Sequence, residues 1–246
     1  RGAAVASDPR GRAHGGGSDS YGWYNTYKIL RDNGWNNSEL YAVNYGYESA
    51  LMSGNNDHSS TNVNRVKDFI NAVYAYVGNK KVTVVAHSLG VTISRKAMKD
   101  GNLYSKVETF IAIAGGNRGL PTCGSVTSYY TYVQIAYTPT CSSSTGFLYP
   151  PSGHYYYQDG NYTGYPYYFI GKLNSSSYGD NQMSGKTTRT YVIMSLVDEI
   201  AGVRASYTSK LNGAYKTKTY SVAPYGHFNA KNLTASVQLS MINRTY

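Results

Sequence analysis

The sequence has no long apolar run, and its uninterrupted apolar stretches are only a few residues each. A helix needs about 20 consecutive apolar residues to cross a bilayer, so we expect no membrane-spanning helix and no stable membrane insertion. Residues 1–20 contain arginines but no apolar segment of signal-peptide type. If the protein is secreted, we therefore expect its signal peptide to have been removed. The length of 246 residues is enough for one large domain with a sizeable core, with two smaller domains as the alternative.

Cysteine is almost absent. The two cysteines, Cys123 and Cys141, lie in a stretch rich in Ser, Tyr, Gly and Pro that has little apolar content to hold it together. We expect a disulfide there, which for a ring of this size contributes about 3 kcal/mol in the chain-entropy treatment. The alternative is two free thiols in a cytosolic protein. The disulfide favours a secreted, extracellular protein. Asn-x-Ser/Thr sequons, which agree with secretion but also arise by chance in such a chain, begin at Asn36, Asn161, Asn174, Asn232 and Asn243.

Acidic residues are scarce, with 13 Asp and Glu against 23 Lys and Arg, which gives a net charge of +10. The basic residues are scattered and form no long run, so we expect them to serve solubility. Attraction to an anionic lipid or polymer surface is the alternative. No nucleic-acid-binding motif accompanies the charge, so we expect no nucleic acid partner.

Strand-like and helix-like segments alternate along much of the chain. The clearest helix covers residues 61–77, where apolar side chains recur at steps of three and four. Residues 1–13 show no periodicity and are expected to be irregular. The sequence predicts strands at 39–45, 82–86, 107–114, 191–196 and 218–222, and helices at 20–33, 61–77, 88–99 and 230–243. Strands separated by helices favour parallel βαβ units in a three-layer α/β domain.

Residues 117–189 break this alternation. They hold both cysteines, several prolines and 13 of the 28 tyrosines. A structureless loop of that length is uncommon inside a compact domain, so we expect an insertion or cap with short elements of its own over one end of the sheet. The predicted organisation is a single domain, 1–246, with this Tyr-rich segment inserted in it.

A serine stands at the junction between the predicted strand 82–86 and the predicted helix 88–99. The pattern is Ala86-x-Ser88-x-Gly90. It resembles the sharp strand-to-helix turn that projects a nucleophilic serine in α/β-hydrolases. Strand and helix pass very close at such a turn, so the positions two before and two after the serine need small side chains. Ala86 and Gly90 meet that need, and Ser88 is the candidate nucleophile.

A serine hydroxyl needs a base, and the base needs a carboxylate that orients it. In this fold the acid and then the histidine follow the serine along the chain. Asp198 comes just after the predicted strand 191–196, and His227 follows the predicted strand 218–222. The neighbouring Glu199 is the alternative acid, whereas Asp180 has no strand before it. Histidines set aside by position are His14, His58, His87 and His154.

Acyl transfer also needs two backbone donors aimed at the developing oxyanion. One is expected to be the N–H of Leu89, directly after the candidate nucleophile. The other is expected from the Gly-rich turn at 14–17, with Gly16 as the donor and His14 in a structural role.

Together, several stretches resemble secreted class 2 lipases. They are His-Gly-Gly-Gly-Ser at 14–18, Leu-Tyr-Ala-Val-Asn-Tyr-Gly at 40–46, Val-Lys-Asp-Phe-Ile-Asn-Ala-Val at 66–73, Ala-His-Ser-Leu-Gly at 86–90 and Ala-Gly-Gly-Asn-Arg-Gly-Leu at 114–120. The last of these, with Gly-His-Phe-x-x-Lys-Asn at 226–232, resembles more particularly the lipase-like extracellular poly(3-hydroxybutyrate) depolymerases. One departure is Pro-Arg-Gly-Arg-Ala at 9–13, where that family has an apolar strand.

This resemblance implies an α/β-hydrolase fold with a mostly parallel sheet, no cofactor, no metal, and a triad of Ser88, Asp198 and His227. It also implies a serine ester hydrolase. The chain has 28 tyrosines, and Tyr, apolar on its faces and polar at its tip, suits adhesion to a wet, ester-rich surface. We expect a monomer that acts on water-insoluble esters, either acylglycerols or a polyester, with the scarcity of Leu, Ile and Met in the insertion favouring polyester or short-chain esters.

Three alternatives remain open. The tyrosines could simply pack the insertion. The triad is shared with peptidases and amidases, and a short-chain esterase would use it as well. The chain could also be a catalytically inactive relative that binds surfaces.

Overall fold

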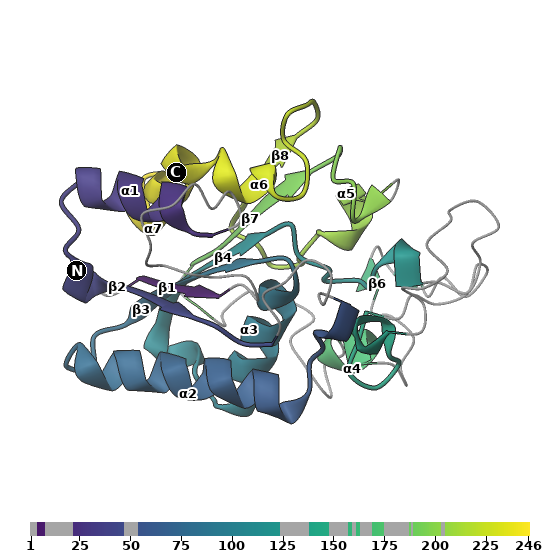
Figure 1. Cartoon of the computed structure of the whole chain (residues 1–246), viewed down its shortest axis with the longest axis horizontal. Helices are drawn as coiled ribbons and strands as arrows, with labels where there is room; N and C mark the ends of the chain where they lie inside the picture. The colour runs from purple at the N-terminus through teal and green to yellow at the C-terminus, as the bar shows by residue number, and fades with distance from the viewer. Residues whose placement is uncertain are drawn as a thin grey trace.

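The computed structural model describes residues 4–7, 22–46, 54–123, 138–147, 157–158, 161–162, 169–174, 187, 189–202 and 205–246. A six-stranded sheet runs through the molecule in the order β2-β1-β3-β4-β7-β8 (Figure 1). Each strand pairs in parallel with its neighbours. The strands are β1 (Ala4–Ser7), β2 (Leu40–Val43), β3 (Val82–His87), β4 (Val107–Ile113), β7 (Arg189–Ser195) and β8 (Lys216–Tyr220). Because all six run the same way, the segments that follow their carboxyl ends meet at one edge of the sheet.

Helices cover both faces of this sheet. Helix α1 (Tyr24–Asp32), the short α6 (Asn229–Asn232) and α7 (Ala235–Ile242) lie on one face, and α2 (Ser60–Tyr76) and α3 (Leu89–Asp100) lie on the other (Figure 1). The residues of β3 alternate accordingly. Val84 and Ala86 join the apolar cluster under α2 and α3, whereas Val85 joins the cluster under α1 and α7. This two-sided burial explains why the strand reads as a continuous apolar run. The fold is that of an α/β-hydrolase, as the sequence predicts.

The region 117–189 contributes short elements where the structure describes it. These are the 3₁₀ turns η4 (Pro121–Cys123) and η6 (Pro139–Cys141), the antiparallel strands β5 (Tyr157–Gln158) and β6 (Asn161–Tyr162), and α4 (Phe169–Asn174). Other short elements of the chain are η1 (Asn37–Glu39), η3 (Tyr104–Lys106) and α5 (Ala205–Thr208). The predicted disulfide is present between Cys123 and Cys141 and joins η4 to η6. Most of the tyrosines of this region lie outside the described residues.

Two sequence-based expectations about elements are wrong. Residues 1–13 were expected to be irregular, but Ala4–Ser7 form β1, inserted between β2 and β3. A strand of four residues is too short to show an alternation of apolar and polar side chains. Its pairing with β2 on one side and β3 on the other specifies it instead.

The expected helix 230–243 is two helices. The hydroxyl of Thr234 donates to the carbonyl of Ala230 at 2.7 Å, and Gln238 Nε2 donates to the carbonyl of Lys231 at 2.7 Å. These side chains occupy acceptors that a continuous helix would bond through its backbone, so α6 ends and α7 begins anew.

Among the described residues, no helix is both long enough and apolar enough to cross a bilayer.

Candidate active site

Ser88 occupies a strained turn between β3 and α3. Its φ of 55° and ψ of -128° fall in a region that non-glycine residues rarely adopt and that costs on the order of 1–3 kcal/mol. The surroundings hold it there, because the N–H of Ser88 donates to the carbonyl of Ile113 at 2.9 Å and its own carbonyl accepts from Val91 at 3.0 Å. Ala86 and Gly90 are both buried at the close approach of strand and helix. The turn therefore has the backbone that the sequence pattern predicts.

The structure brings Ser88, His227 and Asp198 together from three strand ends. His227 Nδ1 lies 2.8 Å from Asp198 Oδ2, and His227 Nε2 lies 2.9 Å from Ser88 Oγ. A carboxylate can only accept, so Nδ1 carries the proton and Nε2 is left to accept from the serine hydroxyl. We call the contact series Ser88–His227–Asp198 the Ser88 row. Within it, His227 is 4% exposed and Asp198 is 2% exposed, so both are shielded from water.

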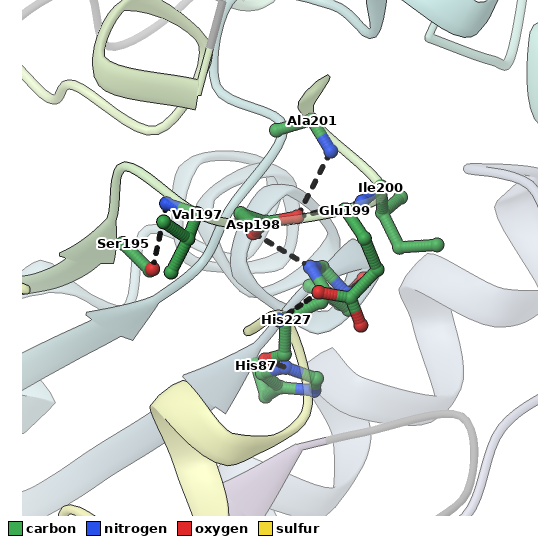
Figure 2. A network of polar contacts seen from close by, with 9 residues as sticks. His87, Ser195, Val197, Asp198, Glu199, Ile200, Ala201 and His227 are labelled. Carbon is green, nitrogen blue, oxygen red and sulfur yellow. Dashed lines mark hydrogen bonds and ion pairs between the residues drawn. The ribbon is translucent and has the colours of Figure 1, made fainter. Parts of the chain in front are cut away.

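Asp198 is held ionised by its contacts. One carboxylate oxygen, Oδ1, accepts from the backbone N–H groups of Ile200 and Ala201, each at 2.9 Å, while the other meets His227 (Figure 2). Burial alone would raise the pKa of this carboxyl, but the His227 imidazole and the two N–H donors outweigh it and hold the pKa below its ordinary value. Asp198 is therefore a carboxylate at neutral pH and fixes the tautomer of His227.

Glu199 contacts His227 in a different way from Asp198. Its Oε2 accepts the backbone N–H of His227 at 2.7 Å, so this bond is made to the main chain and not to the ring. His87 also reaches the same residue, and its Nε2 donates to the carbonyl of His227 at 3.0 Å. These contacts, drawn in Figure 2, were not foreseen. The sequence signal for the Glu199 contact is the adjacent acidic pair at 198–199, but that pattern predicts two alternatives for one role.

Of the two expected oxyanion donors, Leu89 lies among the described residues and Gly16 does not. Leu89 begins α3 directly after Ser88 and is 5% exposed, so its N–H belongs to the first turn of the helix, where backbone N–H groups point out of the end. Gly16, His14 and the rest of the Gly-rich turn lie outside the described residues, as do His154 and Asp180.

His58 is buried near the site without joining the Ser88 row. Its Nδ1 donates to the carbonyl of Thr145 at 2.7 Å, and its Nε2 lies 2.6 Å from Thr92 Oγ1 on the second turn of α3. Its ring stacks on Phe169 of α4, with 4.1 Å between the ring centroids. Burial lowers the pKa of His58 from 6.5 to about 4, so it is neutral at pH 7. It connects α3 to residues 138–147 and to α4.

Over the part of the chain that the structure describes, no three His, Cys, Asp or Glu side chains are grouped so that they could hold a metal ion.

The sequence profile described as Lipase (class 2) matches residues 13–240. Lipase B of Aspergillus fumigatus has a similar structure, with a TM-score of 0.60 and 17% sequence identity over 98% of this chain and 51% of that one. The mature form of the Bacillus licheniformis lipase BlEst2 has a TM-score of 0.60 and 15% identity over 98% of this chain and 91% of that one.

This chain thus spans about half the length of the Aspergillus lipase. At these identities the structural matches establish the fold, and the profile match over most of the chain establishes the family. The chain belongs to the family of class 2 lipases.

Proposed function

We propose that the chain is a secreted carboxylic-ester hydrolase that cleaves water-insoluble esters through an acyl-serine intermediate. Ser88 is the nucleophile, His227 the general base and Asp198 the residue that orients it. The observation that supports this assignment is the continuous row of contacts from Asp198 through His227 to Ser88, at 2.8 and 2.9 Å. Both distances are within hydrogen-bond reach, which is the geometry that an activated serine requires.

In the first half of the reaction, Ser88 Oγ attacks the ester carbonyl carbon while His227 Nε2 takes the hydroxyl proton. The developing oxyanion is held by the N–H of Leu89 and, as proposed from the sequence, by that of Gly16. Collapse of the intermediate breaks the bond to the alcohol oxygen, which leaves with the proton from His227. Water then enters, gives its proton to His227 and attacks the acyl carbon, and the acid departs as Ser88 regains its proton.

The proposed substrates are acylglycerols or a polyhydroxyalkanoate polyester. Membership of the lipase family supports a lipid-like ester. The motifs at 114–120 and 226–232 and the 28 tyrosines support the polyester, because Tyr adheres to surfaces that are both apolar and wet. Secretion is supported by the disulfide, since disulfides persist in oxidising compartments.

We further propose one domain, 1–246, in which 117–189 is an insertion that lies over the end of the sheet where the site forms. Two described parts of this segment support the idea. Thr145 accepts from His58, Phe169 stacks on the same ring, and His58 in turn meets Thr92 of α3. We expect the protein to act as a monomer.

The test is a Ser88→Ala variant assayed on p-nitrophenyl butyrate. We expect its kcat to fall by at least about 10³-fold, because residual hydrolysis then depends on the oxyanion donors alone. Ser236→Ala, at an exposed serine of α7, is the matched control and should behave as wild type. Wild-type turnover by the Ser88→Ala variant would refute the assignment.

The substrate class is tested with tributyrin, a long-chain triglyceride and amorphous polyhydroxybutyrate. Turnover of polyhydroxybutyrate would support the polyester proposal, and turnover of triglyceride alone would replace it with acylglycerols. A chain inert to all three that also fails to react with a phosphonate serine probe would be a catalytically inactive relative.

A further inference from the structure

His227 lies on an irregular segment between β8 and α6. Neither polar group of its main chain is bonded within a helix or a strand ladder. Its N–H instead donates to Glu199 Oε2 at 2.7 Å, and its carbonyl accepts from His87 Nε2 at 3.0 Å. The backbone from which the imidazole projects is therefore held by two side chains.

These two side chains adjoin the other two members of the proposed triad. His87 precedes Ser88 at the end of β3, and Glu199 follows Asp198 after β7. Each strand end thus sends one side chain to the ring of His227 and the side chain of an adjacent residue to its main chain. Asp198 fixes the tautomer of the ring, whereas a bond to the main chain limits where the ring can lie.

Gly226 leaves room for the Glu199 carboxylate because it has no side chain. A Cβ at position 226 would lie 2.4 Å from Glu199 Oε2 and 3.2 Å from Glu199 Cδ. The carboxylate that bonds His227 therefore occupies the space that any other residue at 226 would need. Because that carboxylate is the far end of a flexible side chain, an alanine at 226 would displace it and leave the backbone in place.

We infer that Glu199 is a positioning residue for His227: its carboxylate holds the main chain of the base so that Nε2 meets Ser88, and Gly226 provides the space for it. This inference rests on the proposed function. It assigns Glu199 a role separate from that of Asp198, because one acts on the main chain and the other on the ring. Glu199 is exposed overall, so its replacement leaves the buried core intact.

The first experiment compares Glu199→Ala with Glu199→Gln on p-nitrophenyl butyrate. Small displacements of a reacting group are costly, so we expect Glu199→Ala to lower kcat by about 10-fold or more with KM nearly unchanged. The amide oxygen of Gln can accept the same N–H, so Glu199→Gln should stay within about 3-fold of wild type. The control Glu108→Ala removes an acid on β4 that pairs with Arg244 and should not change kcat.

The second experiment uses Gly226→Ala, which leaves Glu199 chemically intact. We expect it to lower kcat about as much as Glu199→Ala does. The double variant should be no worse than either single variant, because both remove the same bond. Independent, additive losses would overturn the inference, as would a wild-type kcat in Glu199→Ala.

A crystal structure of Glu199→Ala gives a readout that does not depend on turnover. We expect the separation of His227 Nε2 and Ser88 Oγ to exceed about 3.5 Å, the limit of a hydrogen bond. An unchanged separation would refute the positioning role. If the wild-type protein hydrolyses no ester, the proposed function fails, and this measurement still decides the role of Glu199.

Discussion

His58 contacts Thr92 of α3, Thr145 and Phe169 of α4. Its burial among them disfavours the charged form of its ring. Burial is the main reason that its pKa is lowered to about 4, and the nearby cations Arg95 and Lys96 act in the same direction. The carbonyl of Thr145 and the carboxylate of Asp57 oppose them. In the unfolded chain the pKa returns to about 6.5. The unfolded state therefore binds the proton first as the pH falls.

This difference predicts a loss of stability in acid. The contribution of neutral His58 is fully present above pH 6.5 and declines as the pH falls toward 4. Between pH 7 and pH 5 we expect His58 to account for a loss of about 2 kcal/mol in the free energy of unfolding. Urea titrations at the two pH values measure it.

The control for that prediction is His58→Gln, which cannot take up a proton. Its overall stability will differ from wild type, so the quantity to compare is the change between pH 7 and pH 5. We expect a smaller change in the variant. Equal changes in the two proteins would show that His58 does not titrate on unfolding.

The sequence predicted the residues of the Ser88 row because each carries a local signal. Ser88 is framed by small residues, and Asp198 and His227 follow strands in the order that the fold demands. The contact of Glu199 with the His227 main chain has no such signal. A bond to a backbone N–H can come from many side chains, and the need for Gly226 appears only when the two segments are placed side by side.

At the scale of elements, β1 shows how context overrides local sequence. Ala4–Ser7 carry little strand signal, yet they pair with β2 on one side and β3 on the other, with Val5 opposite both Tyr41 and Val84. The longer strands β3, β4 and β7 were predicted within one or two residues because burial on both faces makes them apolar throughout. The break between α6 and α7 depends on side-chain bonds of Thr234 and Gln238, which hydrophobic periodicity does not record.

Because β1 is an interior strand, a proline in it should be poorly tolerated. Val5→Pro removes a backbone N–H between two neighbours, and proline is otherwise confined to edge strands and bulges. We expect the free energy of unfolding in urea to fall by about 3 kcal/mol or more. Val5→Thr keeps the N–H and the β-branched shape and should cost much less. A Val5→Pro protein as stable as wild type would mean that β1 is dispensable.

At the scale of the whole molecule, the two apolar clusters share one sheet. Trp23 and Trp35 are 3% and 4% exposed and belong to the cluster under α1 and α7. Leu89, beside the nucleophile, belongs to the cluster under α2 and α3. Successive residues of the central strands alternate between the two clusters. Unfolding on one face of the sheet would therefore disrupt the packing on the other.

We therefore expect one cooperative unfolding transition, as for a single domain. Tryptophan fluorescence reports on one face, far-UV circular dichroism on the whole chain, and ester hydrolysis on the site at the carboxyl edge of the sheet. In a urea titration the three curves should coincide. Loss of hydrolysis at a urea concentration where tryptophan fluorescence is still native would instead show that the site unfolds as a separate unit.

The order of the site residues along the chain has a consequence during protein synthesis. His227 comes 139 positions after Ser88, so a nascent polypeptide on the ribosome already carries its serine long before the imidazole that would activate it has been made. Translation products that stop short of residue 227 therefore lack the proposed general base, and we expect them to hydrolyse esters far more slowly than the whole chain.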